Sequence, residues 1–220
     1  MKALYWILEL FYPRKCVLCG TLLEKDQTDL CETCRIEAPE YPFRKRKIQF
    51  LDSFTAVWYY EGNVRSSLLR FKFCGQHGYA DTYGRLLAMR LQEWVPEGFD
   101  VLTWVPVSPL RRLERGYDQA RLIAEAVGRE LGMTAVPALK KIRNNRRQSG
   151  ITGEAERRAN VLGVYRIRDA QLWKDRRVLL VDDILTTGST ASECARVLLT
   201  AGAKEVHCAA VAAARKDKKV

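Results

Sequence analysis

The stretch 178–190 constrains the fold more than any other part of this chain. Four apolar residues, Val178 to Val181, follow two arginines and precede two aspartates, which is typical of a short strand buried on both faces. The aspartates mark the expected carboxyl end of that strand. Hydroxyl side chains then surround Gly188, and helical spacing resumes after Thr190. The stretch therefore predicts a strand, a small loop and the start of a helix.

A helix start of this kind suits a phosphate group, because its unpaired N–H groups and the positive end of its dipole face an anion. Asp182 and Asp183 supply oxygen atoms that accept from sugar hydroxyls or bind magnesium. An acidic strand end of the Walker B or phosphoacceptor type is the alternative. The chain has no Gly-x-x-x-x-Gly-Lys-Ser/Thr to accompany a Walker B strand. We therefore expect a site for a phosphorylated sugar with magnesium.

The same stretch resembles the 5-phosphoribosyl-1-pyrophosphate (PRPP) signature of type I phosphoribosyltransferases, and nearly the whole chain resembles the ComF family. The resemblance implies an α/β fold with a central parallel sheet and a small hood. It implies that Asp182 and Asp183 hold the ribose hydroxyls. It also assigns the 5′-phosphate to the loop residues Thr186, Thr187, Gly188, Ser189 and Thr190.

Two Cys-x-x-Cys pairs lie near the start of the chain. Each pair can turn both sulfurs toward one ion, and four thiolates make a closed tetrahedral zinc site. We therefore expect a structural zinc ion rather than accidental or redox pairs, and it would stabilise a module too small for its own core. ComF-family proteins carry a similar module before the transferase domain. The expected ligands are Cys16, Cys19, Cys31 and Cys34.

A second buried strand, Val101 to Val107, leads into a loop that carries Arg111 and Arg112. Ligands of open α/β sheets bind at the carboxyl ends of the strands. A tight loop there can offer N–H groups and fixed positive charge to a diphosphate. Arginines on a solvated turn are the alternative.

The family resemblance extends to two further segments. Lys72, in a Phe-Lys-Phe-x-Gly setting, becomes a candidate ligand-facing cation, while the nearby His77 is expected to be an ordinary loop histidine. Residues 115–119 resemble the family's Arg-Gly-Phe-Asn-Gln pattern, but Asp118 replaces the amide with a carboxylate. This substitution leaves the acceptor specificity open.

A polar, glycine-containing stretch covers about residues 141–160. Inside a compact domain such a stretch is typical of a mobile lid, with a solvated charged loop as the alternative. Lid closure would exclude water from a PRPP-like electrophile that otherwise hydrolyses. Its arginines, and a family pattern of glutamine, arginine and asparagine, give the candidates Arg146, Arg147, Gln148, Arg157 and Asn160.

Composition limits the classes of partner and location. The 220 residues are 47% hydrophobic and 29% charged, which fits one main globular domain with a small addition. The net charge of +11 favours a phosphate-rich partner, although basic residues also keep a surface solvated. No apolar run is long enough for a membrane span, and residues 1–12 predict an amphipathic helix rather than a secretion signal. Metal-type cysteine pairs fit a reducing cytoplasm. The oligomeric state is open.

We therefore expect an N-terminal helix and zinc module over residues 1–45 and a phosphoribosyltransferase domain over residues 46–220. A proline-rich segment and the basic run 44–47 indicate the linker, which is either solvated or in contact with nucleic acid. Within the domain we expect a hood at 50–95, the lid at about 141–160 and the PRPP loop at 182–190.

Two functions fit these features. The first is magnesium-dependent transfer of a phosphoribosyl group from PRPP to an unidentified acceptor, in which the protein positions groups and neutralises charge without a side-chain nucleophile. The second is a non-catalytic PRPP-responsive or single-stranded-DNA-binding protein that acts with competence proteins in DNA uptake, as the ComF name implies. The acidic pair with its loop favours the first function, and the +11 charge is the basis of the second.

Overall fold

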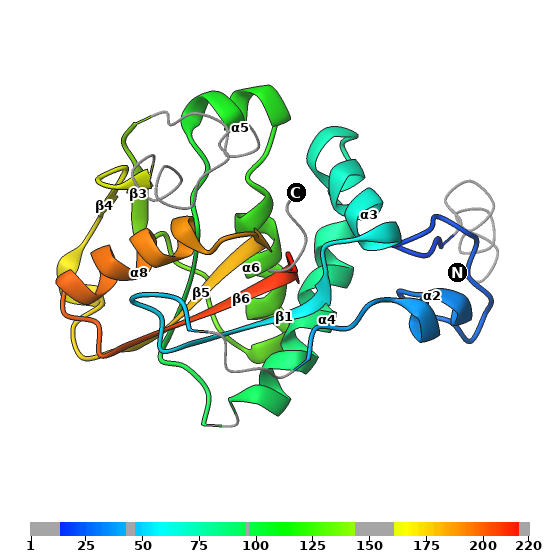
Figure 1. Cartoon of the computed structure of the whole chain (residues 1–220), viewed down its shortest axis with the longest axis horizontal. Coiled ribbons are helices and arrows are strands. Elements are labelled where there is room, and N and C mark those ends of the chain that lie inside the picture. Colours follow the sequence, from blue (N-terminus) through cyan, green and yellow to red (C-terminus); the bar gives the residue numbers. More distant parts are fainter. Residues whose placement is uncertain (1–13, 43–46, 96, 144–160, 216–220) are drawn as a thin grey trace, which may run out of the picture.

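The protein is described by a computed structural model in which residues 14–42, 47–95, 97–143 and 161–215 are placed. Its centre is a parallel sheet of four strands in the order β1-β6-β5-β2 (Figure 1). The strands are β1 (Ser53–Tyr59), β2 (Val101–Trp104), β5 (Arg177–Leu185) and β6 (Glu205–Ala213). The expected N-terminal helix (residues 1–12) and most of the basic run 44–47 lie outside the described residues.

Strands β5 and β6 occupy the centre because both are apolar on two faces. Val178 to Val181 and Cys208 to Ala213 are fully buried. The sequence predicted that strand β5 ends at the two aspartates, but the strand continues to Leu185. Asp182 and Ile184 still pair with alanines of β6, so the acidic pair lies inside the last part of the strand.

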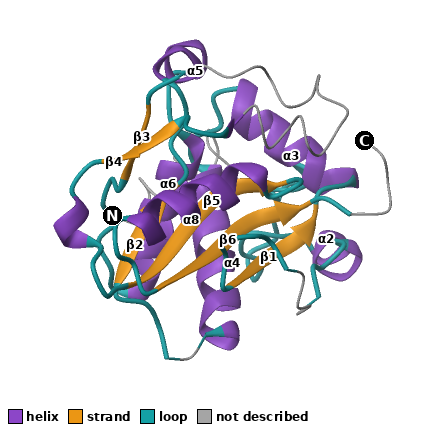
Figure 2. Ribbon diagram, turned by 60° about the vertical axis from the view of Figure 1, so that its left-hand side comes forward, coloured by secondary structure: helices purple, strands orange, loops and turns teal. Residues whose placement is uncertain are grey.

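Helices cover both faces of the sheet (Figures 1 and 2). Helix α8 (Ser189–Thr200) packs on β5 and β6 from one side, and α4 (Tyr79–Trp94) and α6 (Gln119–Leu131) pack from the other. A Cβ atom at Gly84 of α4 would lie 2.3 Å from Ala126 Cβ of α6. Glycine is therefore required for this close approach of the two helices.

Two more helices begin after the carboxyl ends of strands, α3 (Gly62–Phe73) after β1 and α5 (Pro109–Arg115) after β2. Helix α5 replaces the loop that we expected around Arg111 and Arg112. Ser108 caps it by accepting from the Arg111 N–H, Pro109 suits its first turn, and Gly116 ends it at φ 80°. The arginines therefore lie on a short helix.

The segment 50–95, for which we expect a hood, contains β1, α3 and α4. Strand β1 pairs with β6 along its length, and the Ser53 hydroxyl lies 2.7 Å from His207 Nδ1 of that strand. Helix α4 packs mainly against α6. The pairing partner of β1 lies about 150 residues later in the chain, which is why local pattern alone did not place it.

A separate antiparallel ribbon joins β3 (Leu139–Lys141) to β4 (Tyr165–Ile167). It lies beside α8, where Glu193 accepts from the Gly163 N–H at 2.8 Å. A short 3-10 helix, η2 (Ala170–Leu172), follows the ribbon. Most of the expected lid, residues 144–160, lies outside the described residues.

The N-terminal module contains α2 (Glu32–Glu37) and packs against α3 and α4. Its Val17 and Leu18 share one apolar core with Phe71 of α3. Asp29 accepts from Arg85 of α4 at 2.7 and 3.0 Å. The module therefore shares its core with the main domain.

The segment that follows the module covers the free edge of the sheet. The Tyr41 N–H donates to the Val57 carbonyl at 2.9 Å, and the Tyr59 N–H donates to the Pro39 carbonyl at 2.7 Å. These bonds use the backbone groups of β1 that would otherwise be open to another strand. Within the part of the chain that the structure describes, no helix is long and apolar enough to cross a membrane.

Candidate functional site

Three predicted site residues meet at the carboxyl end of β5. Asp182 and Asp183 come from the strand, and Lys72 comes from the last turn of α3. Lys72 Nζ lies 2.8 Å from Asp183 Oδ2 in an ion pair that is largely shielded from solvent. Asp182 Oδ1 accepts from the Asp183 N–H at 2.8 Å. The structure thus brings Lys72 to the acidic pair.

The acidic pair requires positive charge. Burial raises the pKa of Asp182 well above its usual value, and the Asp183 carboxylate raises it further, while Lys72 opposes this. A cation or hydroxyl donors near the pair would relieve the repulsion that Asp183 exerts on Asp182. These oxygen donors fit a hard cation such as Mg²⁺ that arrives with a phosphorylated ligand.

The loop after β5 has a backbone that only glycine adopts easily. Gly188 has φ +85°, and a Cβ atom there would lie 2.6 Å from Ile48 Cδ1. On either side of it, the Thr187 and Ser189 hydroxyl oxygens lie 2.9 Å apart. Helix α8 starts at Ser189, so the loop leads directly into a helix N-terminus, as predicted. Ile48, which packs over the loop, was not singled out from the sequence.

Asp118 ties the segment after β2 to helix α6. Its carboxylate accepts from the Arg121 N–H at 3.2 Å, which caps the helix, and from the Val107 N–H at 3.4 Å. Burial raises the pKa of Asp118, the two backbone hydrogen bonds oppose this, and Asp183 adds to the increase. Asp118 therefore joins the start of α6 to the segment before α5 and lies within electrostatic reach of the acidic pair.

The predicted arginines of α5 occupy different environments. Arg111 is partly buried, and Arg112 is exposed. Arg111 influences the pKa of a buried lysine, Lys141 on β3, which the sequence did not single out. In the sequence, Lys141 belongs to the polar run Lys140-Lys141-Ile142-Arg143, in which no local feature distinguishes a buried lysine from an exposed one.

The other expected lid residues cannot be compared with this arrangement. They are Arg146, Arg147, Gln148, Arg157 and Asn160, and they lie outside the described residues. Their roles stay predictions from the family pattern. His77 is exposed and stacks on Tyr117, with ring centroids 3.9 Å apart.

The four predicted cysteines form one cluster. The sulfur atoms of Cys16, Cys19, Cys31 and Cys34 all lie within 4.8 Å of one another. Cys19 Sγ and Cys31 Sγ are 3.6 Å apart. Tetrahedral zinc with Zn–S bonds of about 2.3 Å places its sulfurs about 3.8 Å apart. The cluster is therefore compatible with structural zinc.

The cluster also needs a cation if all four sulfurs are to be thiolates. Burial raises the pKa of the Cys34 thiol, and the neighbouring Cys19 and Cys31 raise it further. Burial also acts to raise the pKa of Cys19, but hydrogen bonds with Thr21 outweigh it and lower that pKa to about 6. The protein alone thus favours a mixture of thiol and thiolate, which a bound metal ion would convert to four thiolates.

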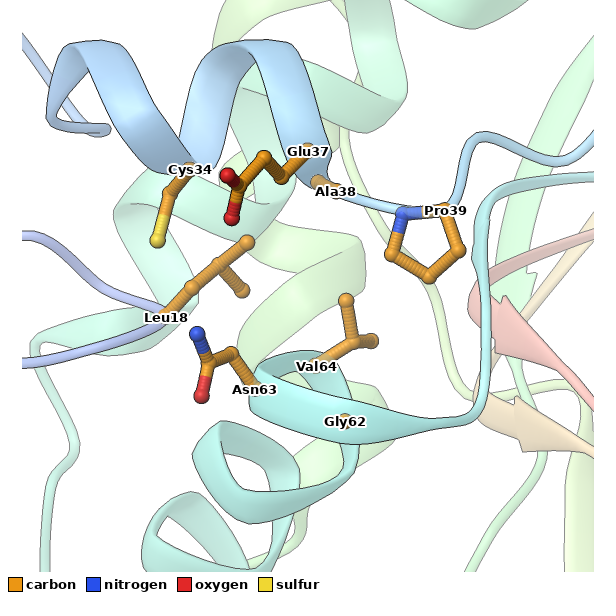
Figure 3. A pocket seen from close by; sticks show the side chains of 8 residues that line it. All are labelled: Leu18, Cys34, Glu37, Ala38, Pro39, Gly62, Asn63 and Val64. Carbon is orange, nitrogen blue, oxygen red and sulfur yellow. The ribbon is translucent and has the colours of Figure 1, made fainter.

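A small pocket lies elsewhere, between α2 and the start of α3 (Figure 3). It measures about 250 Å³, and Glu37 and Asn63 are its polar side chains. Asn63 is nine residues before Lys72 on α3, a rise of about 14 Å along the helix axis, and the residues that line the pocket include neither Lys72 nor the two aspartates. The pocket is therefore separate from the site at the end of β5.

Comparisons with known proteins match this architecture. Residues 118–220 match the family model described as phosphoribosyl transferase domain. Competence protein F of Haemophilus influenzae is 25% identical, covering 90% of this chain and 96% of that protein. Competence protein ComFC of Bacillus subtilis is 27% identical, covering 85% of this chain and 72% of that protein.

Among solved structures, the B. subtilis glutamine PRPP amidotransferase covers 61% of this chain and 26% of its own, with 24% identity and a TM-score of 0.43. The family match spans α6, β3 to β6 and α8, and it includes the acidic pair and the Gly188 loop. The parallel sheet agrees with the expected type I phosphoribosyltransferase fold. The matched phosphoribosyltransferase domain, together with similarity to competence F proteins along most of the chain, supports a ComF-family protein with a phosphoribosyltransferase domain.

Proposed function

We propose that this protein binds PRPP with magnesium and transfers the phosphoribosyl group to an acceptor. The observation that carries the proposal is the meeting of Asp182, Asp183 and the Gly188 loop at the carboxyl end of β5. In open α/β sheets this edge is where ligands bind. The names of its relatives, competence protein F and ComFC, support a link to competence, and the reduced, metal-type cysteines support a cytoplasmic location.

Different residues of the site bind different groups of PRPP. Asp182 and Asp183 accept from the ribose hydroxyls, and the loop from Thr186 to Thr190 holds the 5′-phosphate at the N-terminus of α8. We assign the pyrophosphate group to the arginines of α5, Arg111 and Arg112. Magnesium neutralises phosphate charge when bound. In the reaction the C1–O bond breaks, pyrophosphate leaves with the electron pair, and the acceptor forms the new bond to C1.

This chemistry needs orientation and charge more than it needs a reactive side chain. Lys72 supplies positive charge to Asp183 in the structure, and it is close enough to turn toward an anionic ligand. The direct test is release of pyrophosphate from PRPP with magnesium and a panel of nucleobases and other amine or amide acceptors. Transfer predicts acceptor-dependent release. PRPP binding without release by any acceptor would instead support the non-catalytic function.

A specific surface supports that second candidate function, binding of single-stranded DNA. Phe73 is 64% exposed, and the Arg115 guanidinium lies 5.4 Å from the centre of its ring. Leu113, on the same short helix as Arg115, is 82% exposed. Exposed aromatic rings beside arginines are typical of surfaces on which bases stack.

The test of this second function is salt-dependent binding of a fluorescent single-stranded oligonucleotide, with and without PRPP. DNA binding predicts an affinity that falls steeply with salt. It also predicts that Phe73→Ala weakens binding about 10-fold, from the loss of one stacked base. Equal affinity of the wild type and Phe73→Ala for the oligonucleotide would show that this surface does not bind single-stranded DNA.

The glycine of the loop gives a matched pair of variants. Gly188→Ala is expected to weaken PRPP binding at least about 10-fold, because the added Cβ meets Ile48 and displaces the backbone that holds the phosphate. Gly132→Ala is the control, since Gly132 also has positive φ (+68°) but nothing lies within 4 Å of its Cβ position. Both variants carry a left-handed strain of about 1–2 kcal/mol. Calorimetry of PRPP binding and thermal melting together separate loss of the site from loss of stability.

A further inference from the structure

We infer that Lys141 is a further ligand-binding residue of the proposed PRPP site, and that its ammonium group binds a phosphate group of the ligand. The inference rests on the proposed function and adds a residue to it. It is carried by the position of Lys141 on the β3–β4 ribbon, by its burial, and by the charges around it.

The ribbon turns Lys141 inward. In β3 the burial pattern is buried, exposed, buried over Leu139, Lys140 and Lys141. Because successive side chains of a strand point to opposite faces, Lys140 faces solvent and Lys141 faces the protein. Lys141 is only 7% exposed. A lysine buried to this extent normally has an anionic or hydrogen-bonding partner.

Such a partner is missing within the described part of the chain. There the Lys141 ammonium has neither an ion pair nor a hydrogen bond, and its contact is the ring of Tyr165, whose centre lies 5.5 Å from Nζ. A cation–π contact offsets part of the cost of removing an ammonium group from water. Within the described residues, nothing therefore competes with a ligand for the remaining donors of Lys141.

The surroundings of Lys141 identify that ligand as an anion at the proposed site. Arg111 and Arg115 of α5, Asp182 of β5 and Cys194 of α8 act electrostatically on Lys141. Asp118 acts on Tyr165 of β4, the ring that Lys141 contacts. Two guanidinium groups and an ammonium group thus lie within electrostatic reach of two carboxylates, Asp182 and Asp118. This excess of positive charge suits a phosphate group, and it is within electrostatic reach of both Asp182 and the arginines of α5.

The titration of Lys141 agrees with this geometry. Burial, followed by repulsion from Arg111, lowers its pKa to about 8. A bound phosphate group would raise that pKa again, so ligand binding takes up a proton near this pH. Affinity should therefore fall as the pH rises above about 8. Deprotonation of Asp182 with rising pH acts in the opposite direction on a ligand that carries magnesium, so a matched variant is needed to separate the two.

The test compares Lys141→Met with Lys140→Met, which changes the exposed neighbour on the same strand. Calorimetry with Mg²⁺ and PRPP is expected to show affinity about 10- to 100-fold weaker for Lys141→Met, the range for a hydrogen bond to a charged group. Lys140→Met should bind like the wild type. Ribose 5-phosphate and pyrophosphate, titrated separately, show which phosphate group Lys141 contacts, because only one of them should lose affinity.

Two further readouts distinguish ligand binding from a structural role. Lys141→Met removes a buried, unpaired charge, so the melting temperature of the ligand-free protein at pH 7 should stay equal or rise. Lys141→Arg keeps the charge, so its affinity should not fall as the pH rises from 7 to 9.5, whereas that of the wild type should.

Each outcome bears on a definite claim. If wild type binds PRPP and Lys141→Met binds it equally at every pH, the inference is wrong and the proposed function stands. If the wild type binds neither PRPP nor its two fragments, both fail. If Lys141→Met does not fold, an unchanged pH dependence in Lys141→Arg overturns the inference.

Discussion

Replacing Cys16 with serine is expected to release a structural zinc ion and to lower the free energy of unfolding by more than about 4 kcal/mol, as the loss of a metal does in small modules. Cys16 is fully buried, and its sulfur lies within 4.8 Å of the other three. Serine at this position removes one of the four expected ligands, so the three remaining cysteines no longer form a closed four-thiolate site. In a chain of this size the melting temperature should fall by roughly 10 °C or more.

Metal analysis and thermal unfolding check this prediction. Wild-type protein purified under reducing conditions without chelators should carry about one zinc ion per chain, and Cys16→Ser should carry none. Cys74→Ser is the matched control, because Cys74 is exposed and lies outside the cluster. Wild-type protein without zinc, together with equal melting temperatures for both variants, would contradict the proposal that the four cysteines bind a structural zinc ion.

The consequences of zinc loss should extend beyond the module. Val17 and Leu18 share a core with α3, and Arg70 of that helix donates to the Leu18 carbonyl at 2.6 Å. Lys72, two residues later, lies at the acidic pair. The sequence indicated a module stabilised by its own metal, whereas the shared core couples it to the helix that reaches the proposed site. Cysteine spacing cannot show such coupling, because it depends on which residues of a distant segment pack against the module.

The strand, loop and helix at 178–190 were predictable because each has a local signal. The buried run of Val178 to Val181, the hydroxyl-rich loop and the helical spacing after it all agree with the structure. The end of the strand was placed too early. Asp182 is paired with Ala210 of β6, a contact made some 28 residues later in the chain, and a charged pair at that position looks like a strand end when read alone.

Helix α5 shows a local signal that was misread. Ser108 followed by Pro109 is a helix N-terminus by capping and by the fixed φ of proline, yet the many arginines suggested a loop. Lys141 and Ile48, unlike Ser108 and Pro109, carry no local sequence signal. Their importance comes from the helices and the loop packed against them, so no reading of neighbouring residues could have identified them.

Changing both aspartates to asparagine is expected to weaken binding of PRPP with magnesium more than about 100-fold, because the two carboxylate charges that we propose hold the ribose and its cation are lost while shape is kept. The fold should survive. Burial and mutual repulsion raise the pKa of Asp182, so the ionised Asp182 lowers the free energy of unfolding above that pKa. Asparagine removes this destabilisation. The loss of the Lys72–Asp183 ion pair offsets part of this gain.

Asp100→Asn is the matched control. Asp100 accepts from the Arg177 N–H at 2.7 Å at the opposite end of β5, and asparagine can accept the same bond. The control should therefore bind PRPP like the wild type.

The central claim is that the carboxyl end of β5 binds PRPP, and calorimetric titration of PRPP with Mg²⁺ into wild type and into Asp182→Asn/Asp183→Asn tests it most directly. We predict saturable binding to the wild type and none measurable to a double variant whose melting temperature is unchanged or higher. Equal affinity in the folded double variant would contradict the claim.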